Sequence, residues 1–242
     1  MTSGLLYGLI AAAANVLGGI AAARGAKLGI RIISGFVAFG AGFMIAVALV
    51  RMLPHAFELG GPEAAVFVLI GYLAVHLTQH TATQHFHFGE ETHSVTHTAG
   101  VTALIGLLLH TFFDGVAIAS AFAVNSALGI LVFLAIVVHK VPEGLTITSL
   151  QLAGGTKPTR AIGSAALLGV ATIVGVLATD SVSFLTAHGL ALSAGVTIYV
   201  AASNLVPEFQ HKAGWRLPAA FFLGAGMFFA TKWGLELVGV SA

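Results

Sequence analysis

Cysteine is absent from the 242 residues, and charged residues are scarce. Without a thiol the chain has no disulfide, no thiolate metal site and no thiol redox chemistry. Charged residues make up 8% of the chain and hydrophobic residues 57%, whereas about a quarter of the residues in soluble domains are charged. The few Lys and Arg are too dispersed to form a basic face, so no nucleic-acid partner is expected. This composition predicts an all-α, polytopic membrane protein.

Long apolar runs fill most of the chain. A window of about 20 residues, the length that crosses a bilayer, separates eight candidate spans. They cover residues 4–23, 32–54, 63–80, 99–123, 126–150, 161–183, 187–206 and 217–239. The first run is interpreted as a retained span, because no positively charged region precedes it. The loops are short, so one transmembrane transporter domain over residues 1–242 is predicted.

Basic residues favour one orientation of these spans. With the N-terminus outside, seven of the ten Lys and Arg fall in inside loops. These are Arg24, Lys27, Arg31, Lys157, Arg160, Lys212 and Arg216. The positive-inside rule therefore predicts a multi-pass protein of the cell membrane with both termini outside.

The pattern H-x-x-x-[D/E]-G occurs twice, at the middle of the fourth and fifth runs. The first word begins at His110 and includes Asp114, and the second begins at His139 and includes Glu143. At positions i and i+4 a helix presents both side chains on one face, and ionisable groups at bilayer depth usually face an interior pathway. Four nitrogen and oxygen donors suit Zn²⁺ and other borderline divalent ions. A cation transporter is indicated, although two structural His–carboxylate hydrogen bonds remain the alternative.

Internal repetition supports that interpretation. The two words lie in consecutive runs joined by a tight turn near Asn125, so the runs are antiparallel and matching residues can meet. A fainter echo links residues 51–55 with residues 204–208. Inverted repeats with a midplane site are typical of transporters. Pro142, inside the second word, frees the carbonyl of Val138 and is predicted to loosen the helix or only to bend it.

The two words, their order and the eight-run layout resemble the ZIP (Zrt/Irt-like) family of divalent metal transporters, which bring zinc, iron, manganese or related ions into the cytosol. The resemblance implies eight helices, with spans 1–3 and 6–8 related by inverted symmetry around spans 4 and 5. It also implies that Met44 is a fifth ligand, although a core methionine is the alternative. No enzyme activity and no resident cofactor are then expected. The transported ion would be Zn²⁺ first, with Fe²⁺, Mn²⁺ and Cd²⁺ as alternatives.

The chain departs from the resemblance at a second ion position. Many members hold two adjacent ions, but the positions that supply the second set of ligands read Thr111, Lys140 and Thr172 here. None is a good donor for a second metal. An ammonium at Lys140, beside two acids, could replace the second cation, so we expect one ion at a time by alternating access. Snorkelling of Lys140 to the interface is the alternative.

Histidines concentrate in a loop at about residues 81–98, on the cytosolic side of the predicted topology. The candidate residues for weak metal capture are His80, His85, His87, His93 and His97. Members of the ZIP family often carry such a loop, and solubilising low complexity is the alternative. The expected partners are the divalent ion and membrane lipid, and a homodimer is compatible with the sequence.

Two functions other than transport would also use buried histidines. An intramembrane metal-dependent enzyme would need an open coordination position and a general base, and the H-E-x-x-H helix of metalloproteases is absent. A haem-binding bundle through His110 and His139 is disfavoured, because each histidine has an acid one turn away.

Overall fold

The computed structural model describes residues 2–25, 30–82 and 97–240, and these contain helices and no strand. The long helices are α1 (Thr2–Ala23), α2 (Ile30–Val47), α4 (Ala64–Ala82), α5 (His97–Val124), α6 (Ser126–Ala153), α7 (Pro158–Ser181), α8 (Ser183–Tyr199) and α10 (Arg216–Leu237). The short elements are the π-helical turns η1 (Ala48–Met52) and η3 (Val200–Leu205), the 3₁₀ turn η2 (Gly61–Glu63), α3 (Leu53–Gly60) and α9 (Pro207–Gln210).

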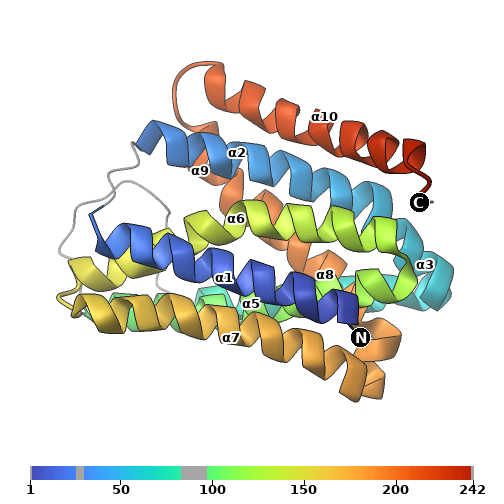
Figure 1. The fold of residues 1–242 in the computed structure, drawn as a ribbon, viewed down its shortest axis with the longest axis horizontal. Coiled ribbons are helices and arrows are strands. Elements are labelled where there is room, and N and C mark those ends of the chain that lie inside the picture. The colour runs from blue at the N-terminus through green and yellow to red at the C-terminus, as the bar shows by residue number, and fades with distance from the viewer. Residues whose placement is uncertain (1, 26–29, 83–96, 241–242) are drawn as a thin grey trace.

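The long helices form one bundle with their axes roughly aligned (Figure 1). Helix α1 packs against α6 and α7, α5 against α6 and α7, α2 against α10, and α4 against α8. Helix α1 starts and α10 ends at the same end of the bundle (Figure 1).

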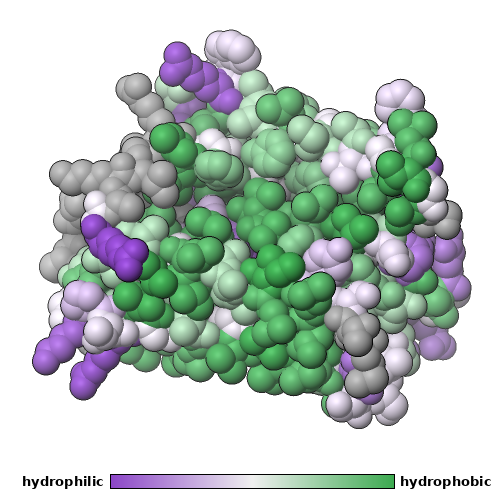
Figure 2. All heavy atoms as spheres, viewed as in Figure 1, coloured by the Kyte–Doolittle hydropathy of each residue, from purple (hydrophilic) through white to green (hydrophobic). Residues whose placement is uncertain are grey.

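The surface of the bundle is that of a membrane protein. Within the described residues, six stretches are long and apolar enough to cross a bilayer: Ser3–Ala23, Ile32–Gln79, Gly100–Val124, Ser126–Ala153, Pro158–Ser181 and Ser183–Gln210. Figure 2 shows hydrophobic residues over the middle of one face and hydrophilic residues gathered toward the two ends. Large apolar side chains such as Leu17 and Phe222 are exposed on the surface of the bundle. A multi-pass membrane protein is confirmed at this level.

Asn125 and Gly61 each mark a break between consecutive helices. Asn125 is extended, and its side-chain oxygen accepts a hydrogen bond of 2.8 Å from the backbone N–H of Leu128, which caps α6. The predicted tight turn near Asn125 is therefore confirmed. Gly61, with a φ of 57°, ends α3 and divides the long stretch Ile32–Gln79 into two helical parts.

Glycines let four pairs of helices cross at backbone contact. At the crossing of α1 and α6, a Cβ on Gly144 would strike the carbonyl oxygen of Asn15, and one on Gly18 would strike that of Val141. Each other crossing has the same reciprocal form. Between α5 and α7, Gly115 faces the carbonyl oxygen of Thr172 and Gly175 that of Phe112. Between α2 and α10, Gly42 faces the carbonyl oxygen of Phe221 and Gly224 that of Phe39. Between α4 and α8, Gly71 faces the carbonyl oxygen of Leu192 and Gly195 that of Val68. Such contacts suit helices in lipid, where close backbone approach replaces hydrophobic burial.

Prolines have different effects at different places. Pro54 and Pro207 lie two residues after the π-helical turns η1 and η3, where a wider turn accommodates the missing backbone donor. Pro142, by contrast, lies inside α6, which continues as one α-helix to Ala153. Pro142 therefore does not end the helix, and its predicted loosening or bending of α6 stays a prediction.

Candidate metal centre

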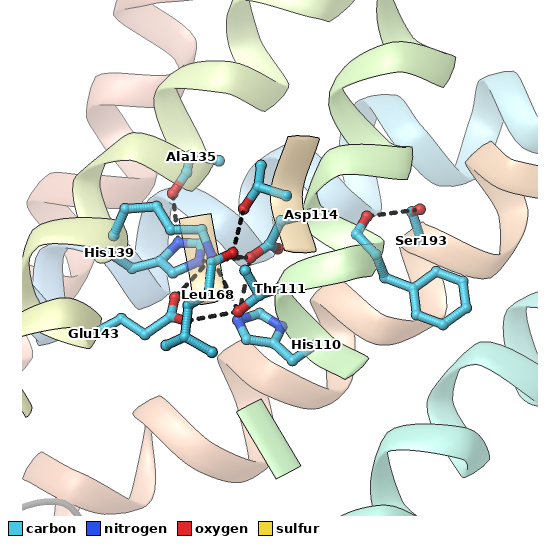
Figure 3. A network of polar contacts seen from close by, with 11 residues as sticks. His110, Thr111, Asp114, Ala135, His139, Glu143, Leu168 and Ser193 are labelled. Carbon is cyan, nitrogen blue, oxygen red and sulfur yellow. Dashed lines mark hydrogen bonds and ion pairs between the residues drawn. The ribbon is translucent and has the colours of Figure 1, made fainter. Parts of the chain in front are cut away.

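The two words meet at the centre of the bundle. Helix α5 carries His110 and Asp114 one turn apart, and α6 carries His139 and Glu143 in the same way (Figure 3). All four side chains are buried, and one nitrogen or oxygen atom from each lies within 4.8 Å of the others. The four predicted donors therefore form one cluster, which a single small cation can reach.

A carboxylate oxygen lies between the two imidazoles. Oδ2 of Asp114 is 3.4 Å from Nε2 of His110 and 3.5 Å from Nε2 of His139. Nδ1 of His139 lies 3.0 Å from the carbonyl of Ala135 and must donate to it, since that oxygen only accepts. In the neutral ring Nε2 then carries a lone pair and faces the Asp114 oxygen. Nε2 of His139 has no hydrogen-bond partner among the described residues, so its lone pair is available to a cation.

Lys140 places an ammonium inside the same cluster. Its side chain is fully buried, and Nζ lies 2.6 Å from Oδ2 of Asp114 and 2.8 Å from Oε2 of Glu143. Thr111 completes the network: its hydroxyl donates to Oε1 of Glu143 at 2.7 Å and lies 3.4 Å from the ammonium (Figure 3). The alternative of snorkelling is wrong, because the ammonium is paired with two carboxylates in the interior.

The sequence of the chain matches the family model described as ZIP zinc transporter over residues 92–232, which is more than half of the chain. The chain belongs to the ZIP zinc transporter family. The matched region contains both words and the helices that carry them. The family is named for zinc transporters and not for enzymes, which speaks against the alternative of an intramembrane enzyme.

Curated relatives are similar over part of their length. The chain is 28% identical over 157 residues to zinc transporter ZIP9 of Micropogonias undulatus, which covers 59% of this chain and 50% of that protein. It is 30% identical over 152 residues to zinc transporter foi of Drosophila melanogaster, over 59% of this chain and 22% of that protein. Zinc transporter SLC39A7 of Rattus norvegicus is 29% identical over 139 residues, 51% of this chain and 29% of that protein. The chain thus spans about half, or less, of the relatives it matches.

Met44, Thr172 and the loop histidines are also predicted to have roles in metal binding or at the second ion position. Met44 is fully buried in the main apolar cluster of the core. Thr172, on α7, donates its hydroxyl to the carbonyl of Leu168 at 3.4 Å. The residues of the predicted capture loop cannot be placed in this way. His85, His87 and His93 lie outside the described residues, as do the side chains of His80 and His97.

A small cavity adjoins one side of the cluster. Its wall includes His110, His139 and Glu143, together with Val200 and Asn204 of the π-helical turn η3. Residues of α2, α5 and α6 and a further residue of η3 complete it, namely Val37, Leu107, Pro142 and Leu205. Three of the four donors, all except Asp114, therefore border a cavity on the side where α8 continues into η3.

Sequence reasoning missed Asn15. Its side chain is completely buried on α1, and neither its amide nitrogen nor its carbonyl oxygen has a hydrogen-bond partner among the described residues. Its backbone packs against Gly144, the residue after Glu143. The available signal was a single Asn within an otherwise apolar first run, since a buried amide in a membrane helix is costly.

Proposed function

We propose that the protein carries a divalent metal cation, Zn²⁺ first, across the membrane through His110, Asp114, His139 and Glu143. The observation that carries this proposal is the convergence of four donors within 4.8 Å at full burial, in a ZIP family member. Two imidazoles and two carboxylates make a set of four N/O donors, the number that Zn²⁺ takes in tetrahedral sites. The same set also accepts Fe²⁺, Mn²⁺ and Cd²⁺, which remain alternatives.

Two further groups of residues belong to the proposal as accessory donors. The full burial of Met44 is compatible with a fifth ligand from the second span as well as with packing. The loop histidines His80, His85, His87, His93 and His97 would capture metal on the cytosolic side. A homodimer stays a prediction.

Eight spans in one transporter domain, residues 1–242, fit the helices best. The stretch Ile32–Gln79 is 48 residues long, far more than one crossing needs, and the turn at Gly61 divides it into two. Helix α10, at 22 residues, is long enough for an additional crossing. The start of α1 and the end of α10 lie at the same end of the bundle, which supports an even number of crossings (Figure 1). The positive-inside rule then puts both termini outside. Transport into the cytosol is proposed from the ZIP resemblance.

Matched glycine contacts support an inverted repeat. Gly144 packs on the carbonyl of Asn15, and Gly115, the equivalent residue of the other word, packs on that of Thr172. The crossing of α1 with α6 thus corresponds to that of α7 with α5, and the crossing of α2 with α10 corresponds to that of α8 with α4. The first half, spans 1–3, is then related to spans 6–8 around the central pair.

The helices divide into two sets by their packing. In the first set, α5 and α6 carry the donors, α1 packs against α6 and α7, and α5 packs against α6 and α7. The second set consists of α2 with α10 and α4 with α8, and each of these two pairs is joined by a glycine crossing. Rocking of one set against the other would expose the donors to each side in turn. Because the Lys140 ammonium already contacts both carboxylates, one metal ion is carried at a time.

The proposal is tested by replacing His139 or Glu143 with Ala. Each variant should lose saturable uptake of zinc into proteoliposomes while it remains folded, because midplane ligands act on the ion rather than on packing. Glu236→Ala is the matched control, since Glu236 pairs with Lys232 on the exposed face of α10. Undiminished uptake in both ligand variants would overturn the assignment.

A further inference from the structure

The centre of the bundle holds two carboxylates and one ammonium in mutual contact. Asp114 and Glu143 are 2% and 5% exposed, and the Lys140 side chain between them is not exposed at all. Both contacts of Nζ are short enough to be direct hydrogen bonds between charged groups. The ammonium is therefore part of the charge that is held away from water whenever the site is closed to both sides of the membrane.

The ammonium changes the charge balance of the site. With neutral imidazoles, the two carboxylates and the ammonium leave one net negative charge when no metal is bound, and one net positive charge when a divalent ion is bound. Without the ammonium, the empty site would carry two negative charges and the loaded site none. The energy of a charge in a low-dielectric medium rises with the square of the charge, so a double charge costs about four times as much as a single one.

The two arrangements predict different kinds of transport. A site without the ammonium would move easily when loaded and with great difficulty when empty, so it could only exchange metal on one side for metal on the other. A site with the ammonium carries a charge of the same size in both forms. Neither form is then trapped, and the empty site can return to collect another ion.

The geometry allows the ammonium to remain in place through such a cycle. When a metal ion engages Asp114 and Glu143, Nζ must give up part of its contact with them. The hydroxyl oxygen of Thr111 lies 3.4 Å from Nζ and can accept a hydrogen bond from it. Since α5 supplies Thr111 and α6 supplies Lys140, the ammonium has an alternative partner within the same helix pair.

We propose that Lys140 allows the empty carrier to return, and that it thereby makes the protein a net transporter of metal rather than an exchanger. This inference rests on the proposed transport function. Lys140 acts here as a charge-compensating residue and is not itself a metal ligand.

Two assays on proteoliposomes separate net uptake from exchange. Net uptake is measured with labelled zinc outside and no metal inside, and exchange with zinc on both sides and label outside only. Lys140→Met should lower net uptake about tenfold or more while tracer exchange persists, because only the empty return step then moves a double charge. Lys140→Arg, which keeps the charge, should restore net uptake. Lys232→Met, on the exposed face of α10, is the matched control for losing a lysine.

A second variant guards against a folding defect. Lys140→Gln can still donate hydrogen bonds but carries no charge, so it should behave like Lys140→Met in both assays. Net uptake at the parental rate in both neutral variants would overturn the inference, as would a parallel loss of net uptake and exchange. If the parent protein itself shows neither activity, the proposed function fails, and this inference fails with it.

Discussion

The two words on α5 and α6 repeat the same pattern, yet their polar groups have different surroundings. Nδ1 of His139 donates to the carbonyl of Ala135, whereas Nδ1 of His110 has no partner among the described residues. After the histidine, α5 places the neutral hydroxyl of Thr111 and α6 the ammonium of Lys140. The comparison teaches that the repeat supplies the donors and the helix crossings, while the divergence between its copies supplies the charge and orients one imidazole.

Gly115 and Gly144 occupy the same position in the two words and make equivalent contacts. Of the changes considered, their replacement should have the largest effect, a loss of protein stability. In Gly115→Ala and Gly144→Ala the new methyl group would strike a backbone carbonyl of α7 or α1. Both variants should lose about 2 kcal/mol or more of stability, because a clash with backbone cannot be relieved by a rotamer change. Thermal unfolding in detergent measures this loss.

Gly163→Ala is the control for both variants, because a Cβ at this position of α7 meets no atom within 4 Å. If Gly115→Ala and Gly144→Ala melt with the parent, the two crossings are not held by backbone contact. A loss in only one of them would show that the words differ in packing as well as in charge.

An intermediate effect is expected where the words differ in their polar residues. Thr111→Val keeps the shape of the side chain but removes the hydrogen bond to Oε1 of Glu143. The KM for zinc uptake should rise about three- to tenfold, since a hydrogen bond to a charged group is lost. Thr179→Val is the control, because the buried Thr179 hydroxyl donates to the carbonyl of Gly175, away from the cluster. Equal KM values for the two variants would contradict a role for Thr111 at the site.

The smallest effect concerns the residues whose backbones pack on the two word glycines. The Asn15 amide has no partner among the described residues, while the Thr172 hydroxyl donates to Leu168. Asn15→Leu should raise the melting temperature only slightly, because the gain from removing an unpaired buried amide is partly offset by the cost of fitting a larger side chain beside Gly144. Thr172→Val should leave it nearly unchanged. A lower melting temperature for Asn15→Leu would mean that the amide has a stabilising partner.

Much of the fold could be predicted from hydrophobic runs alone. Runs at 126–150 and 161–183 correspond to α6 (Ser126–Ala153) and α7 (Pro158–Ser181), with ends shifted by a few residues. The runs at 32–54 and 187–206, however, include the π-helical turns η1 and η3, which hydropathy does not reveal. A wider turn changes hydrogen bonding without changing the apolar character of the segment, so hydropathy does not reveal it, although a proline comes soon after each of the two turns.

The sequence by itself determined which residues share a face. His110 with Asp114 and His139 with Glu143 are one helical turn apart, and local helix geometry alone aligns them. Hydropathy placed these pairs inside the membrane, where ionisable groups must find partners. The sequence alone therefore predicts two histidine–carboxylate pairs inside the membrane, that is, four donors for a metal ion.

Only the tertiary structure decided how the pairs meet and what else lies between them. The position of the Lys140 ammonium between two carboxylates depends on the distance and register of α5 and α6, and so does its contact with Thr111. The burial of Asn15 beside Gly144 depends in the same way on the crossing of α1 with α6. The crossing of α1 with α6 is set by glycine contacts between residues far apart in the chain, and such contacts leave no periodic signal in either segment.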